Sequence, residues 1–109
     1  MKNLLTEKEI NQFQKNGAIF IKGKFDYKWI EKLKIGIEKD IKNPSPRFKS
    51  HTNQNDLPAY LEDYWTWDLV PEFTDFVFNS PYSEIASELM SADKINLVMD
   101  NWFLREAGS

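Results

Sequence analysis

The chain has 109 residues, of which 41% are hydrophobic and 15% aromatic, with a net charge of −3 and no cysteine. This length allows one small domain, the aromatic content argues against a disordered tail, and the lack of cysteine excludes disulfides and thiolate metal sites. No stretch approaches the ~20 apolar residues of a membrane span, and the first residues lack the apolar run of a signal peptide. We therefore expect a cytoplasmic protein with no membrane partner.

Charge is unevenly distributed along the chain. Residues 1–50 contain twelve Lys and Arg against six Asp and Glu, whereas residues 51–109 contain two against eleven. Such asymmetry can mark a nucleic-acid-binding surface. Here the lysines alternate with apolar helix positions, as on solvated helix faces, and no basic cluster is interleaved with aromatics. We expect no nucleic-acid partner.

The first predicted helix begins after Thr6. Thr6 and Glu9 have the spacing of a capping box, in which each side chain accepts a hydrogen bond from the backbone of the other residue. Gly17 suits the left-handed conformation that ends many helices. The apolar run 18–21 then predicts a short strand.

The longest predicted helix begins at Asp26 and ends at Asn43, because the residue before a proline avoids the helical region. Its apolar residues recur at spacings of three and four and form one stripe: Ile30, Leu33, Ile37 and Ile41. The polar stretch 45–58 predicts a loop, and we interpret 60–67 as a short extended or turn segment.

Two further helices are predicted, one beginning at Pro71 and one with Ser80 as N-cap and Pro81 at its first position. Their inward residues are predicted to be Phe73, Phe76 and Val77 in the first and Ile85, Ala86, Leu89 and Met90 in the second.

The last stretch, 95–106, predicts a long strand. Side chains alternate between the two faces of a strand, and both faces of this one are mostly apolar, which favours a strand covered on both sides, such as a barrel wall. No later strand could pair with it. We therefore expect the chain to be the N-terminal part of a larger protein whose sheet begins here.

Few residues point to chemistry by their pattern alone. His51 is the single histidine, so the two-histidine, one-carboxylate type of iron site cannot be built, and we predict no metal site. Three acids surround the aromatic segment and could act as general acids or bases if buried, or be ordinarily solvated: Glu62, Asp63 and Asp68. Three aromatics of that segment could line a substrate pocket or belong to the core: Tyr64, Trp65 and Trp67.

Arg105 shares a predicted strand face with Asn101 and Phe103. A guanidinium at the end of a strand can hold a carboxylate through its paired donors, or it can extend into solvent. Phosphate-binding glycine loops, nucleophile elbows and zinc-type spacings are absent from the sequence.

Several sequence landmarks recur in a fixed order along nearly the whole chain. They are Leu5-Thr6-x-x-Glu9-Ile10-x-x-Phe13-x-x-x-Gly17, Asp63-Tyr64-Trp65-x-Trp67, Pro71-Glu72-Phe73-x-Asp75-Phe76-Val77-Phe78-x-Ser80-Pro81, Ile85-Ala86-x-Glu88-Leu89-Met90 and Asp100-Asn101-x-x-Leu104-Arg105-Glu106-x-Gly108. Together they resemble the N-terminal part of the phytanoyl-CoA dioxygenase family of iron(II)- and 2-oxoglutarate-dependent oxygenases.

The resemblance implies an α+β fold in which N-terminal helices and a short strand pack on the first long strand of a double-stranded β-helix, or jelly-roll barrel. Residues 1–109 would form the N-terminal part of one oxygenase domain, with 1–93 a mainly helical cover and 94–109 the first barrel strand. The family binds Fe(II) through a His-x-Asp pair and a distant His, which this chain lacks. It uses O2 and 2-oxoglutarate to hydroxylate a small organic or acyl substrate.

The resemblance also bears on Arg105. In relatives the corresponding strand commonly ends in Lys-Glu-Pro-Gly, and that lysine can contact 2-oxoglutarate. Here the run is Arg105-Glu106-Ala107-Gly108, so the resemblance implies a 2-oxoglutarate contact for Arg105, with Asn101 on the same face. We predict that the 109 residues alone bind no iron and are inactive. The alternative is a small non-catalytic protein-interaction module that captures a partner by strand addition.

Overall fold

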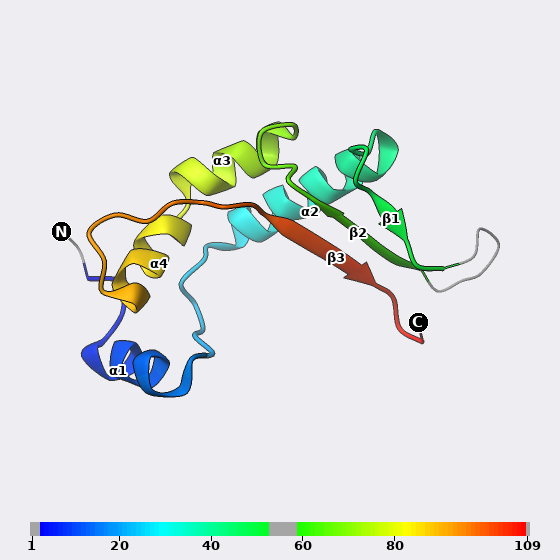
Figure 1. The fold of residues 1–109 in the computed structure, drawn as a ribbon. Coiled ribbons are helices and arrows are strands. Elements are labelled where there is room, and N and C mark those ends of the chain that lie inside the picture. The colour runs from blue at the N-terminus through cyan, green and yellow to red at the C-terminus, as the bar shows by residue number, and fades with distance from the viewer. Residues whose placement is uncertain (1–2, 53–58, 109) are drawn as a thin grey trace.

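The computed structural model describes residues 3–52 and 59–108. In that part of the chain the fold is α+β, with four helices and a small open antiparallel sheet whose strand order is β1-β2-β3 (Figure 1). The elements in chain order are α1 Glu7–Asn16, α2 Tyr27–Lys42, β1 Lys49–Ser50, β2 Tyr60–Tyr64, α3 Pro71–Asn79, α4 Tyr82–Met90 and β3 Asn101–Arg105. No helix of the described residues is long and apolar enough to cross a membrane.

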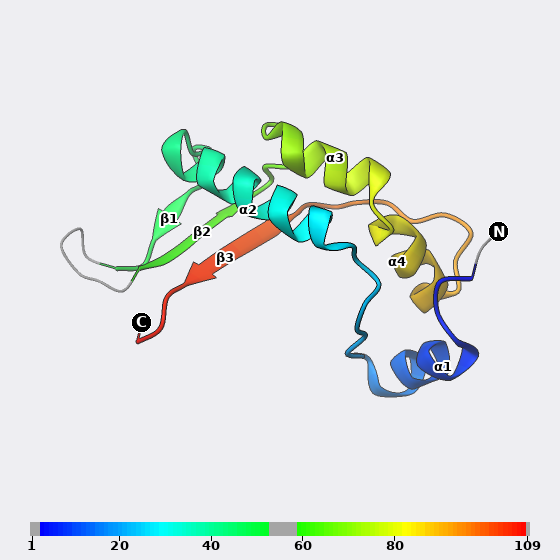
Figure 2. The ribbon, with the colours of Figure 1, turned by 180° about the vertical axis from the view of Figure 1, so that it is seen from behind.

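One face of the sheet is covered by helices. α2 lies behind the strands in Figure 1 and in front of them in Figure 2, and α3 packs beside α2. The buried centre consists of Val70, Phe73 and Trp102. Partly buried apolar residues from α2, the sheet and the segments next to it pack around this centre: Leu33, Ile37, Ile41, Phe48, Leu61, Trp67 and Leu104.

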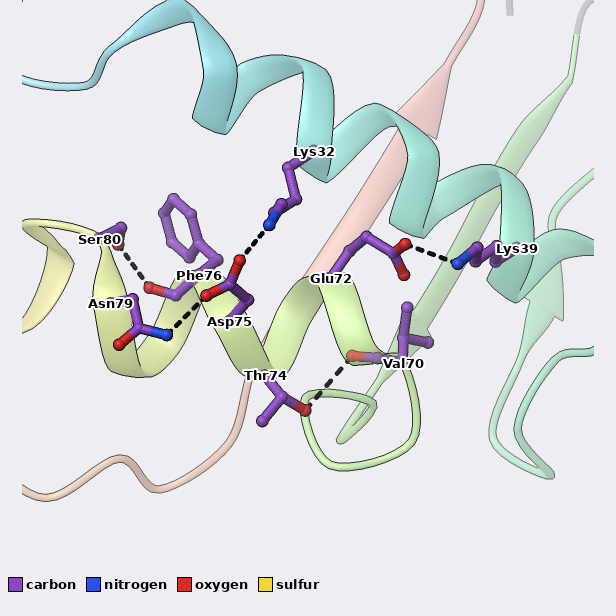
Figure 3. Close-up of polar contacts among 9 residues, drawn as sticks. All are labelled: Lys32, Lys39, Val70, Glu72, Thr74, Asp75, Phe76, Asn79 and Ser80. Carbon is purple, nitrogen blue, oxygen red and sulfur yellow. Dashed lines mark hydrogen bonds and ion pairs between the residues drawn. The ribbon is translucent and has the colours of Figure 1, made fainter.

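α2 and α3 are held together by apolar packing and by two ion pairs (Figure 3). Lys32 pairs with Asp75, and Lys39 Nζ lies 2.6 Å from Glu72 Oε2. Both lysines are roughly half exposed, and ion pairs of this kind contribute only about 0.2–1 kcal/mol each. The apolar contact between the two helices is therefore the larger stabilising term.

α1 and α4 pack together at the end of the molecule away from the sheet (Figure 1). The backbone N–H groups of Leu4 and Leu5 donate to the two carboxylate oxygens of Glu88, at 2.9 and 3.0 Å. Gln14 donates its side-chain amide to the Leu89 carbonyl at 2.6 Å. These bonds attach the N-terminal segment and α1 to α4.

The predicted helix ends are confirmed. Thr6 and Glu9 form the reciprocal capping box, with bonds of 3.1 and 2.9 Å, and Gly17 ends α1 at φ 77°. The Asp26 carboxylate accepts a bond from an N–H of the first turn of α2, and this helix ends at the residue before Asn43. Local sequence determines such ends because their hydrogen bonds join residues only a few positions apart.

The predicted long strand 95–106 is wrong in its first half, because only Asn101–Arg105 is a strand. β3 pairs with β2, and the last pair of the ladder is Tyr64 with Asn101. Beyond Tyr64 the chain turns away at Trp65, which has a left-handed φ of 55°. Residues 94–100 therefore have no strand to pair with, and they run past α4 and α3 instead (Figure 1).

The predicted strand 18–21 is also wrong, because these residues are not in a strand. They lie on the chain between α1 and α2, away from the sheet (Figure 2). Phe20 in this run is 80% exposed. An apolar tetrapeptide forms a strand only where another strand offers it backbone partners.

Two of the predicted inward positions are wrong. Ile30 is 43% exposed, and its neighbour Trp29 is buried in its place, with its ring 6.0 Å from that of Phe76 in a T-shaped contact. Met90, the last residue of α4, is 58% exposed. The predicted start of α4 is wrong by one residue, because the N-cap is Pro81 and Ser80 is the C-cap of α3. The Ser80 hydroxyl nevertheless accepts the N–H of Tyr82, the first residue of α4, at 3.2 Å.

Candidate functional site

The strand register separates the side chains of the sheet into two sets. One set, which includes Asp63 and Trp102, faces α2 and is buried. The other set faces away from the helices and carries Phe103, which is 59% exposed. We call this second set the open face: Tyr60, Glu62, Tyr64, Asn101, Phe103 and Arg105.

Arg105 lies at one end of the open face. Its guanidinium carbon is 5.2 Å from the centre of the Tyr60 ring, on the neighbouring strand. This cation–π contact orients the guanidinium plane. The side chain is exposed, so its paired donors lie where a ligand carboxylate could approach.

Asn101 lies at the other end of the same strand face. Arg105 is four residues further along the strand, at a distance of about 13 Å. A single carboxylate cannot contact both side chains. Asn101 instead borders a cavity of about 310 Å³ between α2, α3 and residues 97–102.

This cavity is lined mainly by apolar side chains, including those of Leu33, Phe73 and Trp67. Asp100 and Asn101 supply polar groups beside them. Its volume is at the lower end of the range for small-molecule sites. A small, largely apolar molecule is the kind of ligand that it could hold.

The three aromatics predicted as a possible pocket are directed to different places. Tyr64 lies on the open face with the Arg47 guanidinium 5.7 Å from its ring. Trp65 is half exposed in the turn after β2, where Arg47 donates to its carbonyl at 2.7 Å. Trp67 faces the cavity and meets the ring of Phe78 at 5.8 Å. Only Trp67 of the three therefore borders the cavity, and a joint substrate pocket stays a prediction.

His51 and Glu62 come together at the edge of the open face. His51 Nε2 is 2.9 Å from Glu62 Oε1, and the centre of its ring lies 4.7 Å from that of Tyr60, with the two rings tilted by 46°. Within residues 3–52 and 59–108, no group of three or more His, Cys, Asp or Glu residues could hold a metal ion. The residues present therefore do not fit the iron site of the oxygenase family. Asp68 is exposed.

Asp100 anchors the turn between β2 and α3. Its carboxylate accepts the Thr66 N–H at 3.0 Å, the Thr66 hydroxyl at 2.8 Å and the Trp67 N–H at 3.1 Å. Its own carbonyl accepts the Trp65 N–H at 2.9 Å. One residue thereby holds the left-handed turn against the beginning of β3.

Sequence reasoning named Asp63 as an acid that could act if buried, but it missed Asp40 and the pairing of the two. Asp40 in the last turns of α2 is 1% exposed, and Asp63 in β2 is 0% exposed. Trp102 is the cross-strand partner of Asp63, and its indole N–H donates to Asp40 Oδ2 at 3.1 Å, so the two carboxyl groups lie on the same side of the sheet and interact with each other. The pair joins α2, β2 and β3 at one point beneath the sheet.

The two acids have shifted pKa values of opposite direction. Burial raises the pKa of Asp40 from 3.8 to about 7, and the hydrogen bond to Asp63 and the charge of Asp63 add to this increase. Burial also acts to raise the pKa of Asp63, but the hydrogen bonds from Asp40, Ser45 and Tyr64 outweigh it and leave that pKa below 3.8. Below about pH 7 the pair therefore retains one proton, on Asp40.

A signal for this pair was present in the sequence. Asp40 is seven residues after Leu33 and three after Ile37, so it lies on the apolar stripe of α2. Asp63 is two residues after Leu61 in the strand segment, so the two side chains lie on the same face. A carboxylate on an apolar stripe and another on an apolar strand face indicate a buried pair.

Comparison of the chain with models of protein families, with curated proteins and with solved structures finds no match.

Proposed function

We propose that this chain forms the N-terminal helical cover and first barrel strand of an iron(II)- and 2-oxoglutarate-dependent oxygenase related to phytanoyl-CoA dioxygenases. The completed protein would use O2 and hydroxylate a small organic or acyl substrate. The proposal begins from the ordered set of sequence landmarks described above. The structural observation that carries it is the open face of the sheet.

A sheet covered by helices on one side and bare on the other fits the wall of a barrel. β3 is an edge strand of the described sheet, and Phe103 on its open face is 59% exposed, whereas Trp102 on the covered face is 8% exposed. Further strands pairing with β3 would remove this edge and enclose the open face. Arg105 would then be at the end of a strand lining the interior.

The proposal assigns only part of the chemistry to these residues. The iron ligands would come from further barrel strands outside these 109 residues. His51, the single histidine of the sequence, is paired with Glu62. The chain would supply the barrel wall and, at Arg105, one cation for a carboxylate of 2-oxoglutarate.

The proposal is tested by reading the coding DNA beyond the codon for Ser109. We expect an open frame that soon encodes His-x-Asp, and later a further His and a basic residue. A stop codon directly after Ser109 would contradict the proposal.

The role of Arg105 is tested in the protein encoded by that longer frame. We expect Arg105→Ala to raise the KM for 2-oxoglutarate by about 10- to 100-fold, the equivalent of one charge-assisted hydrogen bond. Arg105→Lys should have a smaller effect, because it keeps the charge but loses the paired donors. Lys34→Ala, at an exposed cation of α2 and so away from the open face, is the control. An unchanged KM in Arg105→Ala would reject this role while leaving the oxygenase assignment to the DNA test.

The same open face also favours a second candidate, a small non-catalytic protein-interaction module. An edge strand bearing an exposed Phe103 could accept an extended peptide by strand addition. This candidate predicts a stop codon directly after Ser109, the result that would contradict the oxygenase proposal. It also predicts a stoichiometric complex with a peptide partner, blocked by proline substitution in β3.

A further inference from the structure

The buried pair Asp40 and Asp63 is placed where three elements meet. Asp40 belongs to the last turns of α2, Asp63 to β2, and the Trp102 indole that bonds Asp40 belongs to β3. Ser45, in the turn after α2, bonds Asp63 and is itself buried. A change in the charge of this pair would therefore act on α2 and the sheet together.

The hydrogen bonds decide which acid is ionised. Asp63 accepts the Ser45 hydroxyl at 2.5 Å and the Tyr64 N–H at 2.8 Å on Oδ1, and the Ser45 N–H at 3.1 Å on Oδ2. A carboxylate that accepts three donors is stabilised in its charged form. Asp63 is therefore the carboxylate of the pair.

Asp40 has the opposite environment. The Trp102 indole donates to one of its oxygens, and its other neighbours are the carboxylates of Asp63 and Asp100, whose charges both disfavour ionisation. Two cations close to the pair in sequence are engaged elsewhere. Lys39 pairs with Glu72 of α3, and Arg47 donates to the Tyr64 and Trp65 carbonyls.

We propose that Asp40 and Asp63 form a proton-controlled latch, in which one shared proton holds the last turn of α2 against the sheet and its loss releases that turn. With the proton present, Asp40 donates to Asp63. Without it, two negative charges face each other in a site that excludes water, an arrangement that buried acids avoid. The latch goes beyond the proposed function and does not depend on it.

The pH range of the latch follows from the directions of the two pKa shifts. Asp40 is protonated in the folded state up to about pH 7 but has an ordinary pKa of 3.8 when unfolded. The folded state thus binds more protons between these values, and its stability falls as pH rises through this range. Asp63 has a lowered pKa, so its contribution is lost as pH falls below its ordinary value. Taken together, the two effects make the folded state most stable at a pH between the titration of Asp63 and that of Asp40.

The latch is tested first on the unaltered chain by NMR between pH 5 and 9. We expect the side-chain carboxyl ¹³C signal of Asp40 to titrate near pH 7. Between pH 5 and about 7, hydrogen-exchange protection of the backbone amides of residues 39–45, corrected for intrinsic exchange, should fall by up to about tenfold per pH unit and then level off above the Asp40 titration. Amides of α1 should keep their protection. An Asp40 titration below pH 5, or constant protection of residues 39–45 through the Asp40 titration, would overturn the proposal.

A matched pair of variants separates the proton from other pH effects. Asp40→Asn keeps a neutral side chain that can donate to Asp63 and accept from Trp102, so we expect protection of residues 39–45 to become independent of pH. Asp68→Asn, at an exposed position, should behave as the unaltered chain. Loss of protection in Asp40→Asn with the same pH dependence as the unaltered chain would also overturn the latch. If Asp40→Asn does not fold, the ¹³C titration of the unaltered chain decides.

Discussion

At Gly36 the ring of Phe73 occupies the space that a side chain would fill. A Cβ atom added there would lie 2.5 Å from Phe73 Cε1 and 2.9 Å from Cδ1. Phe73 is 6% exposed and belongs to the core, so its ring has little freedom to move away. Glycine is therefore required by the close approach of α2 and α3.

We expect Gly36→Ala to destabilise the protein. Alanine would improve helix propensity by about 1 kcal/mol, but overpacking a buried site costs about 1–3 kcal/mol, and a 2.5 Å contact with a core ring places this site at the upper end. Urea unfolding followed by circular dichroism measures the difference. Lys34→Ala, on the exposed side of the same helix, is the control and should change stability little. A Gly36→Ala variant more stable than the unaltered chain would show that α3 can shift.

At the scale of elements, the turn between β2 and α3 depends on Asp100. Trp65 in this turn has a left-handed φ, a conformation that costs of order 1–3 kcal/mol for a residue other than glycine. Three hydrogen bonds to the Asp100 carboxylate oppose that cost. The turn ends the β2–β3 ladder, so Asp100 also determines where β3 begins.

Asp100→Ala should lower the free energy of unfolding by about 2 kcal/mol or more, because it leaves three donors without their charged acceptor. Denaturant unfolding monitored by tryptophan fluorescence is a suitable measurement, since Trp65, Trp67 and Trp102 all lie near the turn. Asp93→Ala, at an exposed acid seven residues away in sequence, serves as the control. Equal stabilities of the two variants would mean that the turn holds its conformation without Asp100.

At the scale of the whole molecule, the chain is elongated. Its dimensions are 49 × 29 × 25 Å and its radius of gyration is 16.1 Å, whereas a compact domain of about 100 residues has a radius near 13 Å. The sheet with its two covering helices lies at one end, and α1 with α4 lies at the other (Figure 1). The open face and the edge of β3 are the part of the sheet left without cover in the described structure.

We expect the isolated chain to self-associate through this surface. An edge strand with an exposed aromatic is a site of strand pairing between copies. Phe103→Lys should reduce the concentration-dependent association measured by sedimentation velocity. Phe20→Lys replaces an aromatic that is 80% exposed but far from the sheet, and it should leave association unchanged. Equal association of the two variants would exclude the open face as the contact.

The sequence by itself determined the features that depend on neighbouring residues. The capping box of Thr6 and Glu9, the glycine end of α1 and the end of α2 before Pro44 all involve hydrogen bonds or steric contacts within a few positions, so their residues alone specify them. The apolar spacings of three and four residues that predicted α2, α3 and α4 also depend only on residues close in sequence. The sequence also predicted that Arg105 shares a strand face with Phe103.

Only the tertiary structure decided the features that depend on distant partners. The length of β3 was set by where β2 turns away at Trp65, and residues 18–21 form no strand because they lie far from the sheet. The burial of Trp29 in place of Ile30 was decided by the position of Phe76 on α3. The Asp40–Asp63 pair joins residues 23 positions apart, and its shared proton exists only because folding removes both carboxyl groups from water.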